Sequence, residues 1–217
     1  PAVVCGRPWV DEVLRQVDPT IISKWHTKEG DQVLAGDLLL ELSGMARSLL
    51  TAERTALNFL QLLCGTATRT NTYVQMVEGT RATLLDTRKT VPGLRLAQKY
   101  AVKTGGAENH RIGLFDAFLI KENHIAAAGS IAAAIEAARQ LQGDLRVEVE
   151  VEDLEQMREA IIAKPDWIML DNFTLIDMRK AVSMASNTGI KLEASGGIET
   201  SAELKKIAST GVDYISI

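Results

Sequence analysis

The second half of the sequence alternates between short apolar runs and longer stretches with helical periodicity. The later runs begin about twenty to twenty-five residues apart, which is the length of a compact strand–helix unit. Short Val, Ile and Leu runs that are buried on both faces are typical of parallel strands. We therefore expect six parallel strands, at residues 82–85, 117–120, 146–151, 166–170, 191–194 and 213–217, with helices clearest at residues 131–141 and 153–163.

This alternation predicts an α/β barrel rather than an open doubly wound sheet. No GxGxxG motif follows the first expected strand, and nothing in the sequence marks a reversal of strand order. In such barrels the active site lies at the carboxyl ends of the strands. Residues 81–217 are thus expected to form a barrel domain whose site is built from the residues that follow each strand.

Residues 1–80 have a different character and are expected to form a separate N-terminal domain. Alternation at residues 20–26 and an apolar run at 38–42 predict strands, and Glu29-Gly30-Asp31 predicts a turn. The EGDxVxxGDxL pattern here also occurs in lipoyl- and biotin-carrier domains, but the lysine that such carriers need at a hairpin tip is missing. Apolar residues at three- and four-residue spacing predict a helix over residues 48–78, which Gly65 should interrupt.

Both ends of the sequence look like parts of strands. We therefore expect the first domain to be truncated at its start and the barrel to be truncated at its end. A helix near residues 201–208 should follow the fifth expected strand.

Composition limits the class of ligand. The chain has 217 residues, a net charge of −4, 46% hydrophobic residues and 24% charged residues, so it has no overall basic field that would favour nucleic acid. It has no apolar run long enough to predict a membrane span and no leader-like start. We expect a cytoplasmic protein in which Cys5 and Cys64 are reduced, and any anion site must be local.

Basic side chains gather where two expected strands end, which predicts a pocket for a small polyanion. The guanidinium fork suits carboxylates, so Arg88 and Arg111 are the expected carboxylate ligands. Two alternatives stay open: the arginines pair with Asp86 and Asp116 in structural salt bridges, and the histidine is a hydrogen-bonded core residue. The basic residues of this region are Arg88, Lys89, His110, Arg111 and Lys121.

Acidic and glycine-rich segments end the later strands. Glu150 and Asp171 end consecutive expected strands and suit Mg²⁺ held together with ligand phosphates, although Asp171 would also suit a helix N-cap. Ser195-Gly196-Gly197 precedes a helix, so its backbone suits a phosphate, although two glycines also make an ordinary tight turn.

Several segments resemble quinolinate phosphoribosyltransferase, and together they span nearly the whole chain. They are TAERTALNFLQLLCGTAT, LLDTRKTVPGLRLAQKYAVKTGG, NHRIGLFDAFLIKENHI, LDNF and EASGGI. The resemblance implies an N-terminal α/β sandwich domain packed on a C-terminal, TIM-like α/β barrel, and a homodimer or a higher assembly of dimers. It also implies transfer of phosphoribosyl from phosphoribosyl pyrophosphate (PRPP) to quinolinate with loss of CO₂, which makes nicotinate mononucleotide for NAD synthesis.

The resemblance implies roles for individual residues. Arg54 resembles an arginine that reaches the quinolinate site from the neighbouring subunit, and Lys89 resembles a lysine near the PRPP pyrophosphate. Glu150 and Asp171 resemble the acidic pair near the ribose hydroxyls and Mg²⁺, and residues 195–197 resemble the turn at the 5′-phosphate. The expected substrate-binding residues are Arg54, Arg88, Lys89, Thr90, His110, Arg111, Lys121, Glu150, Asp171, Ser195, Gly196 and Gly197. Lys89, Lys121, Glu150 and Asp171 are expected to act in catalysis as well.

Two other functions stay open at this point. An enzyme like nicotinate phosphoribosyltransferase would bind one carboxylate and would not decarboxylate, but the full set of arginines argues against it. A truncated module would bind ligands without turning them over.

Overall fold

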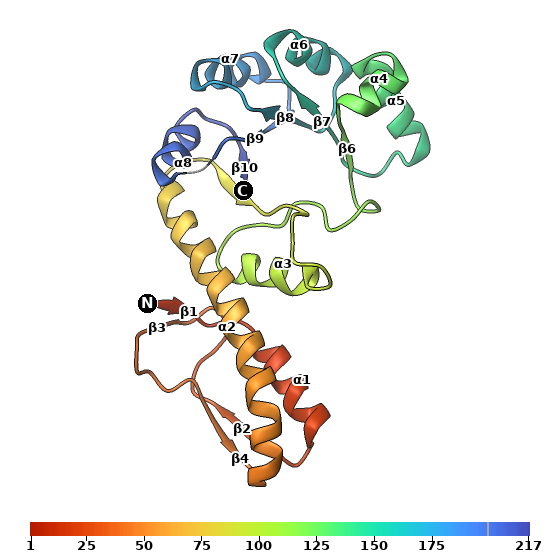
Figure 1. Ribbon diagram of the computed structural model, residues 1–217. Coiled ribbons are helices and arrows are strands. Elements are labelled where there is room, and N and C mark those ends of the chain that lie inside the picture. Colours follow the sequence, from red (N-terminus) through yellow and green to blue (C-terminus); the bar gives the residue numbers. More distant parts are fainter. Residues whose placement is uncertain (199) are drawn as a thin grey trace. The chain divides into compact units, whose positions relative to one another are not determined.

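The computed structural model describes residues 1–198 and 200–217, and it divides into two compact units (Figure 1). The first consists of Pro1–Val74 and Thr90–Ala107, and the second consists of Gln75–Lys89 and Glu108–Ile217. The sequence placed a domain boundary between residues 80 and 81. The units differ from that division chiefly because residues 90–107 belong with the first one.

The first unit is built from two small antiparallel sheets and three helices. Strand β1 (Ala2–Val3) pairs with β3 (Gln32–Val33), and β2 (Ile22–Trp25) pairs with β4 (Leu40–Ser43). The helices are α1 (Arg7–Val17), α2 (Ala46–Val77) and α3 (Arg95–Thr104), of which α1 and α3 were not predicted. Helix α1 starts with Pro8 in its first turn, where the missing N–H costs nothing, and this signal in the sequence was overlooked.

Two apolar clusters hold the first unit together, and both use α2. In one cluster, Val10 and Leu14 of α1 pack with Ala52, Ala56 and Leu60 of α2. The other cluster explains why residues 90–107 belong here, because it places small residues of α3 against α2. Its buried members are Val3, Cys5, Leu63, Ala67, Ala97 and Ala101.

Helix α2 runs without interruption through Gly65, so the expected break at this residue is wrong. An added Cβ at Gly65 would meet no atom within 4 Å, so the glycine leaves a small gap on an open face of the helix. A glycine inside a helix costs only about 1 kcal/mol relative to alanine, and the packing of a long helix outweighs that cost. Among the helices that the structure describes, neither α2 nor any other combines the length and the apolar character needed to cross a membrane.

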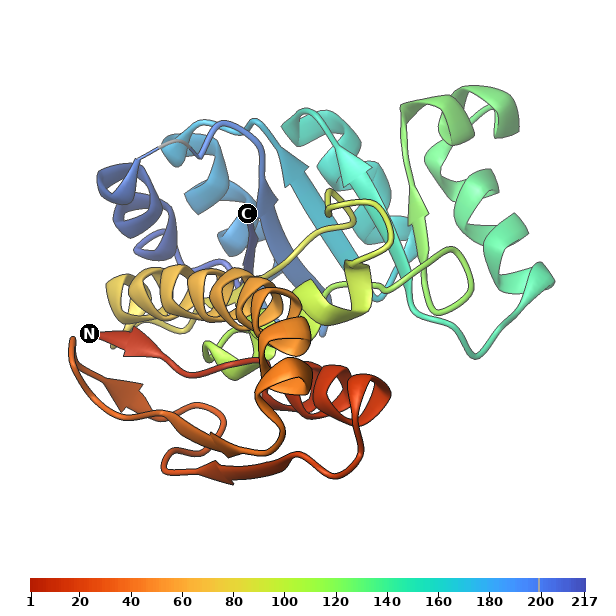
Figure 2. The same cartoon turned by 60° about the horizontal axis from the view of Figure 1, so that its bottom comes forward.

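The second unit contains one six-stranded parallel sheet with the order β5-β10-β9-β8-β7-β6 (Figure 2). Every one of the six expected strands is confirmed to within one residue at each end. In the described residues β5 and β6 form the two edges of this sheet, so the barrel is an incomplete one. The strands are β5 (Thr83–Leu85), β6 (Phe118–Ile120), β7 (Val147–Val151), β8 (Trp167–Asp171), β9 (Lys191–Ser195) and β10 (Tyr214–Ser216).

Five helices cover one face of this sheet (Figure 1). Ser130, Asp153, Thr174 and Thr200 begin four of them as N-caps, and each side chain accepts a backbone N–H of the first turn. The helices are α4 (Glu122–Ala128), α5 (Ile131–Leu141), α6 (Leu154–Ala163), α7 (Leu175–Ala185) and α8 (Ser201–Ala208), of which α4 was not predicted.

The opposite face of the sheet carries the residues of the site, in pairs that lie two positions apart on each strand and therefore share a face. We call the residue nearer the carboxyl end of each strand the upper-layer residue and the one two positions before it the middle-layer residue. The ladders are staggered, so Met169 of the middle layer lies opposite both Glu150 and Glu193. The middle layer contains Leu119, Glu148, Met169 and Glu193, and the upper layer contains Lys121, Glu150, Asp171 and Ser195.

A matched pair of glycine substitutions tests the packing of α3 on α2. A Cβ at Gly105 would lie 2.5 Å from the carbonyl oxygen of Ala67 and 2.7 Å from Cβ of Thr70. Gly105→Ala should therefore lower the free energy of unfolding by about 1–3 kcal/mol. Gly65→Ala, at the open position, should raise it by about 1 kcal/mol. Urea unfolding measures both changes, and equal effects of the two substitutions would contradict the assigned packing.

Candidate functional site

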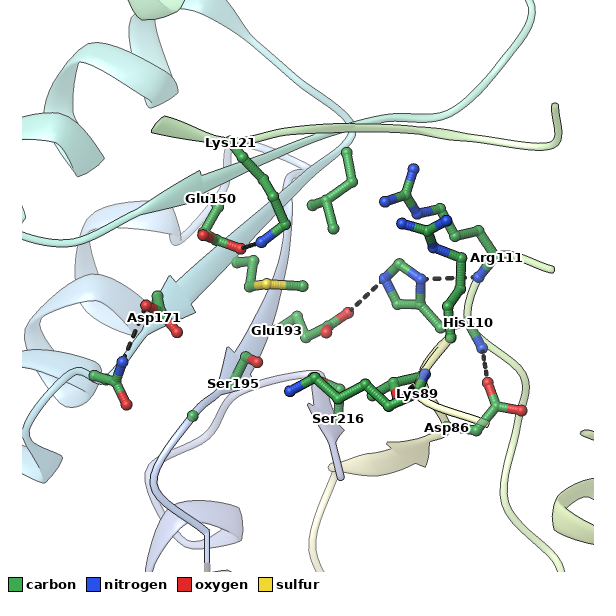
Figure 3. A pocket seen from close by; sticks show the side chains of 16 residues that line it. Asp86, Lys89, His110, Arg111, Lys121, Glu150, Asp171, Glu193, Ser195 and Ser216 are labelled. Atoms are coloured by element: carbon green, nitrogen blue, oxygen red, sulfur yellow. Dashed lines mark hydrogen bonds and ion pairs between the residues drawn. The ribbon is translucent and has the colours of Figure 1, made fainter. Parts of the chain in front are cut away.

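A cavity of about 410 Å³ opens at the carboxyl ends of the strands of the second unit (Figure 3). This volume is typical of a site for a small molecule. All of its lining residues belong to the second unit. They are Asp86, Thr87, Arg88, Lys89, His110, Arg111, Leu119, Lys121, Glu150, Met169, Asp171, Asn172, Glu193, Ser195, Gly196 and Ser216.

Most of the residues that the sequence predicted for the site lie around this cavity. Three do not line it. Gly197 follows Gly196 in the same turn, whereas Arg54 and Thr90 belong to the first unit. Arg54 is exposed on α2, and the hydroxyl of Thr90 accepts a hydrogen bond from Nε of Arg95 at 3.3 Å. The predicted residues that line the cavity are Arg88, Lys89, His110, Arg111, Lys121, Glu150, Asp171, Ser195 and Gly196.

The sequence reasoning missed the three middle-layer residues that line the cavity, which are Leu119, Met169 and Glu193. Glu193 lies two residues before Ser195 on β9, and the two residues therefore share a face of the strand. Leu119 stands in the same relation to Lys121, and Met169 to Asp171. This parity was a usable signal, because it predicts that a residue two positions before each upper-layer residue also faces the cavity.

Side-chain acceptors hold the loop that carries His110 and Arg111. The carboxylate of Asp86 accepts from Nδ2 of Asn109 at 2.7 Å and from the backbone N–H of His110 at 2.9 Å. The carboxylate of Asp116 accepts from the backbone N–H groups of Ile112 at 2.7 Å and Gly113 at 2.9 Å. The loop is therefore positioned without regular secondary structure.

Two guanidinium groups, those of Arg88 and Arg111, line the cavity. Arg111 is only 9% exposed, and burial, together with the charge of Arg88, lowers the pKa of its guanidinium, against the influence of Glu148 and Asp116. An arginine stays protonated under such conditions. Arg88 and Arg111 therefore repel each other, and an anion bound beside both would offset this repulsion; a ligand with two carboxylates suits this pair.

A buried cluster of His110, Glu148 and Glu193 lies beneath the cavity. Nε2 of His110 lies 2.8 Å from a carboxylate oxygen of Glu148 and 3.2 Å from one of Glu193, and both carboxylates are fully buried. Burial raises the pKa of Glu148 to about 7; the hydrogen bond from His110 opposes the shift and the charge of Glu193 adds to it. Burial acts to lower the pKa of His110, but the two carboxylates outweigh it and raise this pKa to about 9.

One imidazole and two carboxylates with ligand atoms within 4.8 Å of one another are a donor set that could hold a divalent metal. The contact made by the second ring nitrogen of His110, Nδ1, argues against metal binding at this cluster. A histidine that binds a metal normally donates its other ring N–H to an acceptor. Here Nδ1 of His110 instead accepts the backbone N–H of Arg111 at 2.8 Å. We therefore interpret the cluster as a proton-sharing group.

Lys121 and Glu150 form an ion pair across the upper layer. Lys121 is the N-cap residue of α4, and its side chain reaches Glu150 on the neighbouring strand β7 (Figure 3). Asp171, at the end of β8, accepts from Nδ2 of Asn172 at 3.0 Å. The N-cap of α7 is Thr174, so Asp171 is not the helix cap that the sequence left open as an alternative.

The Ser195-Gly196-Gly197 segment forms a tight turn after β9. Gly196 and Gly197 have φ values of 85° and 66°, in the region that favours glycine. A Cβ at Gly196 would lie 2.3 Å from Oδ1 of Asn172, so a side chain at this position would block the turn. At the start of α8, Thr200 and Glu203 form a capping box that satisfies their two backbone N–H groups.

The buried cluster should make stability depend on pH. A group whose pKa is raised by folding stabilises the fold at low pH, and this contribution is lost as the pH rises through the folded value. Glu148 rises from 4.5 to about 7 and His110 from 6.5 to about 9, so the free energy of unfolding should fall between about pH 5 and pH 9. Urea unfolding at several pH values measures this slope. Glu148→Gln should flatten its lower part, and an unchanged slope would contradict the assignment.

Comparison with known proteins gives a consistent result over the whole chain. The model of the quinolinate phosphoribosyl transferase N-terminal domain matches residues 1–64, and that of the C-terminal domain matches residues 66–217. A probable nicotinate-nucleotide pyrophosphorylase [carboxylating] from Synechocystis is 45% identical over 217 residues, which cover 99% of this chain and 73% of the relative. The protein of the same description from Bacillus subtilis is 44% identical over 99% of this chain and 74% of its own length.

The solved structures give the same answer. The nicotinate-nucleotide pyrophosphorylase from Francisella tularensis superposes with a TM-score of 0.96 at 50% sequence identity, covering 100% of this chain and 76% of that one. The two domain models leave almost no residue unmatched, and they occur in the order that the fold requires. The chain therefore belongs to the quinolinate phosphoribosyl transferase family.

Proposed function

We propose that this chain joins quinolinate to PRPP and removes one carboxylate as CO₂, giving nicotinate mononucleotide and pyrophosphate for NAD synthesis. The observation that carries this proposal is the pair Arg88 and Arg111 in one small cavity, in a chain that belongs to this family throughout. Quinolinate has two adjacent carboxylates, and two guanidinium forks match them in number, charge and geometry. Lys121 adds a third cation at the same cavity.

PRPP would occupy the rim of the same cavity. Lys89 is exposed there and suits the pyrophosphate, and the turn of Ser195, Gly196 and Gly197 suits the 5′-phosphate because a backbone without side chains lets an anion approach closely. Glu150 and Asp171, on neighbouring strands, suit the ribose hydroxyls. With PRPP bound in this way, its anomeric carbon would lie between the phosphate sites and the diacid pocket.

Mg²⁺ is the cofactor that we propose for this reaction. Two carboxylates on neighbouring strand ends leave most of the metal's coordination positions for substrate oxygens and water, which is the usual arrangement for this ion. Glu150 and Asp171 would hold it, and the bound ion would offset the charge that grows on pyrophosphate.

The reaction needs no covalent bond to the protein. Pyridine N1 attacks C1′ while the bond from C1′ to the pyrophosphate oxygen breaks, and its electron pair leaves with pyrophosphate. The bond from C2 to its carboxylate then breaks, CO₂ departs, and the remaining electron pair takes up a proton. Lys89 would stabilise the first leaving group, and Lys121 would stabilise the anion at C2.

We further propose that the chain acts as a homodimer or a higher assembly of dimers, in the cytoplasm. Arg54 is exposed on α2, where a second copy can receive it, and Leu50 on the same helix is 73% exposed. These two residues are four positions apart and therefore share a helix face. Cys5 and Cys64 are free thiols, which is typical of a reducing compartment.

Arginine substitutions separate this function from binding of a monocarboxylate. Arg88→Ala should weaken quinolinate binding about a hundredfold while the chain still folds, because the pocket loses a charge-assisted bidentate contact. Arg179→Ala, on the exposed side of α7, is the matched control and should leave the affinity unchanged. Isothermal titration measures both. Equal affinity for quinolinate and nicotinate in the wild type would instead favour the monocarboxylate enzyme.

Complementation tests the contribution of Arg54 from a second copy. Arg54→Ala and Arg88→Ala chains should each be inactive alone. Mixed dimers restore one complete site of two, and half of the dimers are mixed, so an equal mixture should recover about a quarter of the wild-type rate of CO₂ release. Absence of recovery after confirmed subunit exchange would place Arg54 outside the partner's site.

A further inference from the structure

The strongest unexplained feature is Glu148, a fully buried carboxylate that does not line the cavity. It lies in the middle layer of the sheet on β7, between helix-facing Val147 and Val149. Burying an ionisable group is costly unless the group is paired and hydrogen-bonded or is held in its neutral form. The nearest charged or polar partner of the Glu148 carboxylate is His110, whose Nε2 lies 2.8 Å from one of its oxygens.

Two contacts together favour one tautomer of the neutral His110 ring. An ionised carboxylate only accepts hydrogen bonds, so Glu148 and Glu193 favour a hydrogen on Nε2. In that tautomer Nδ1 keeps its lone pair, and it accepts the backbone N–H of Arg111 at 2.8 Å. Both ring nitrogens are thus engaged within the protein. The ring acts on the cavity through the residue that it holds, which differs from direct binding of the substrate by His110.

Arg111 is the residue whose backbone N–H donates to the His110 ring. Its guanidinium is buried near that of Arg88, and the two repel each other. The neighbouring backbone N–H groups of the loop donate to Asp86 and Asp116, which are anchored by their own chain segments. The anchor at Arg111 differs because its acceptor is an aromatic ring that can rotate. Glu148 fixes that ring.

We propose that Glu148 is a positioning residue that sets the orientation of Arg111 through His110. The chain of contacts runs from the Glu148 carboxylate to Nε2, and from Nδ1 to the amide of Arg111. Other charged groups face the cluster: Glu193 lies 3.2 Å from Nε2, and Arg146 lies 3.9 Å from Glu148. The proposal rests on the proposed function only for the identity of the ligand, quinolinate.

A conservative and a disruptive substitution separate positioning from packing. Glu148→Gln keeps the volume and an acceptor for Nε2, so the Kd for quinolinate should stay within about threefold of the wild type. Glu148→Leu keeps the volume and removes the acceptor, so the Kd should rise about tenfold, the value of one buried hydrogen bond. The KM for PRPP should stay unchanged. Met157→Ala, fully buried in α6, controls for lost stability and should leave the Kd unchanged.

Two further measurements test the route through Arg111. In an Arg111→Ala background, Glu148→Leu should change the Kd less than about twofold, because the residue it positions is gone. Nitrogen-15 NMR of labelled histidine, recorded above the His110 pKa of about 9 so that the ring is neutral, should show a protonated Nε2 and an unprotonated Nδ1, and a mixture of tautomers in Glu148→Leu. The proposal is overturned if Glu148→Leu leaves the Kd unchanged, if its effect is the same without Arg111, or if Nδ1 carries the proton in the neutral wild-type ring. A wild-type chain that binds quinolinate but releases no CO₂ would instead overturn the proposed function.

Discussion

The alternation of side chains along parallel strands is the constraint on which the second unit depends. One set of residues on β7, β8 and β9 faces the helices, and these residues are small or branched and fully buried, as at Val149, Ile168 and Ala194. The residues of the other set, which alternate with these, face away from the helices. Because the strands are parallel, their carboxyl ends lie at the same end of the sheet, and the polar residues of this second set converge there. The cavity follows directly from this division.

The charged groups of the cavity lie at two levels. Cations surround the space that a ligand would fill, and two carboxylates lie beneath it beside His110. A pocket made only of cations would bind any anion tightly and indiscriminately. The buried acids offset part of that field and hold the ring of His110, so the arginines keep defined positions even though they repel each other.

Periodicity explains what could be predicted. The six strands, α5, α6 and α8 were found because each has a regular pattern between clear turns, and the upper-layer residues followed because they end those strands. Helices α3 and α4 were missed for local reasons. Helix α3 has a small apolar face of alanines, and α4 begins directly after its N-cap Lys121, which the sequence presented as the end of a strand. Gly65 was misjudged because long-range packing outweighs local propensity. The partners of His110 depend on contacts from β7 and β9, which no local pattern contains.

The loop that carries His110 and Arg111 has a consequence for how this fold can diverge. Its backbone is held by two aspartate side chains and an imidazole ring rather than by a strand ladder. Replacing one of those acceptors would re-aim an arginine while leaving every strand of the sheet paired as before. Ligand choice and structural integrity are therefore encoded by different residues. A protein built in this way can exchange one small anion for another in a few substitutions, without passing through an unstable intermediate.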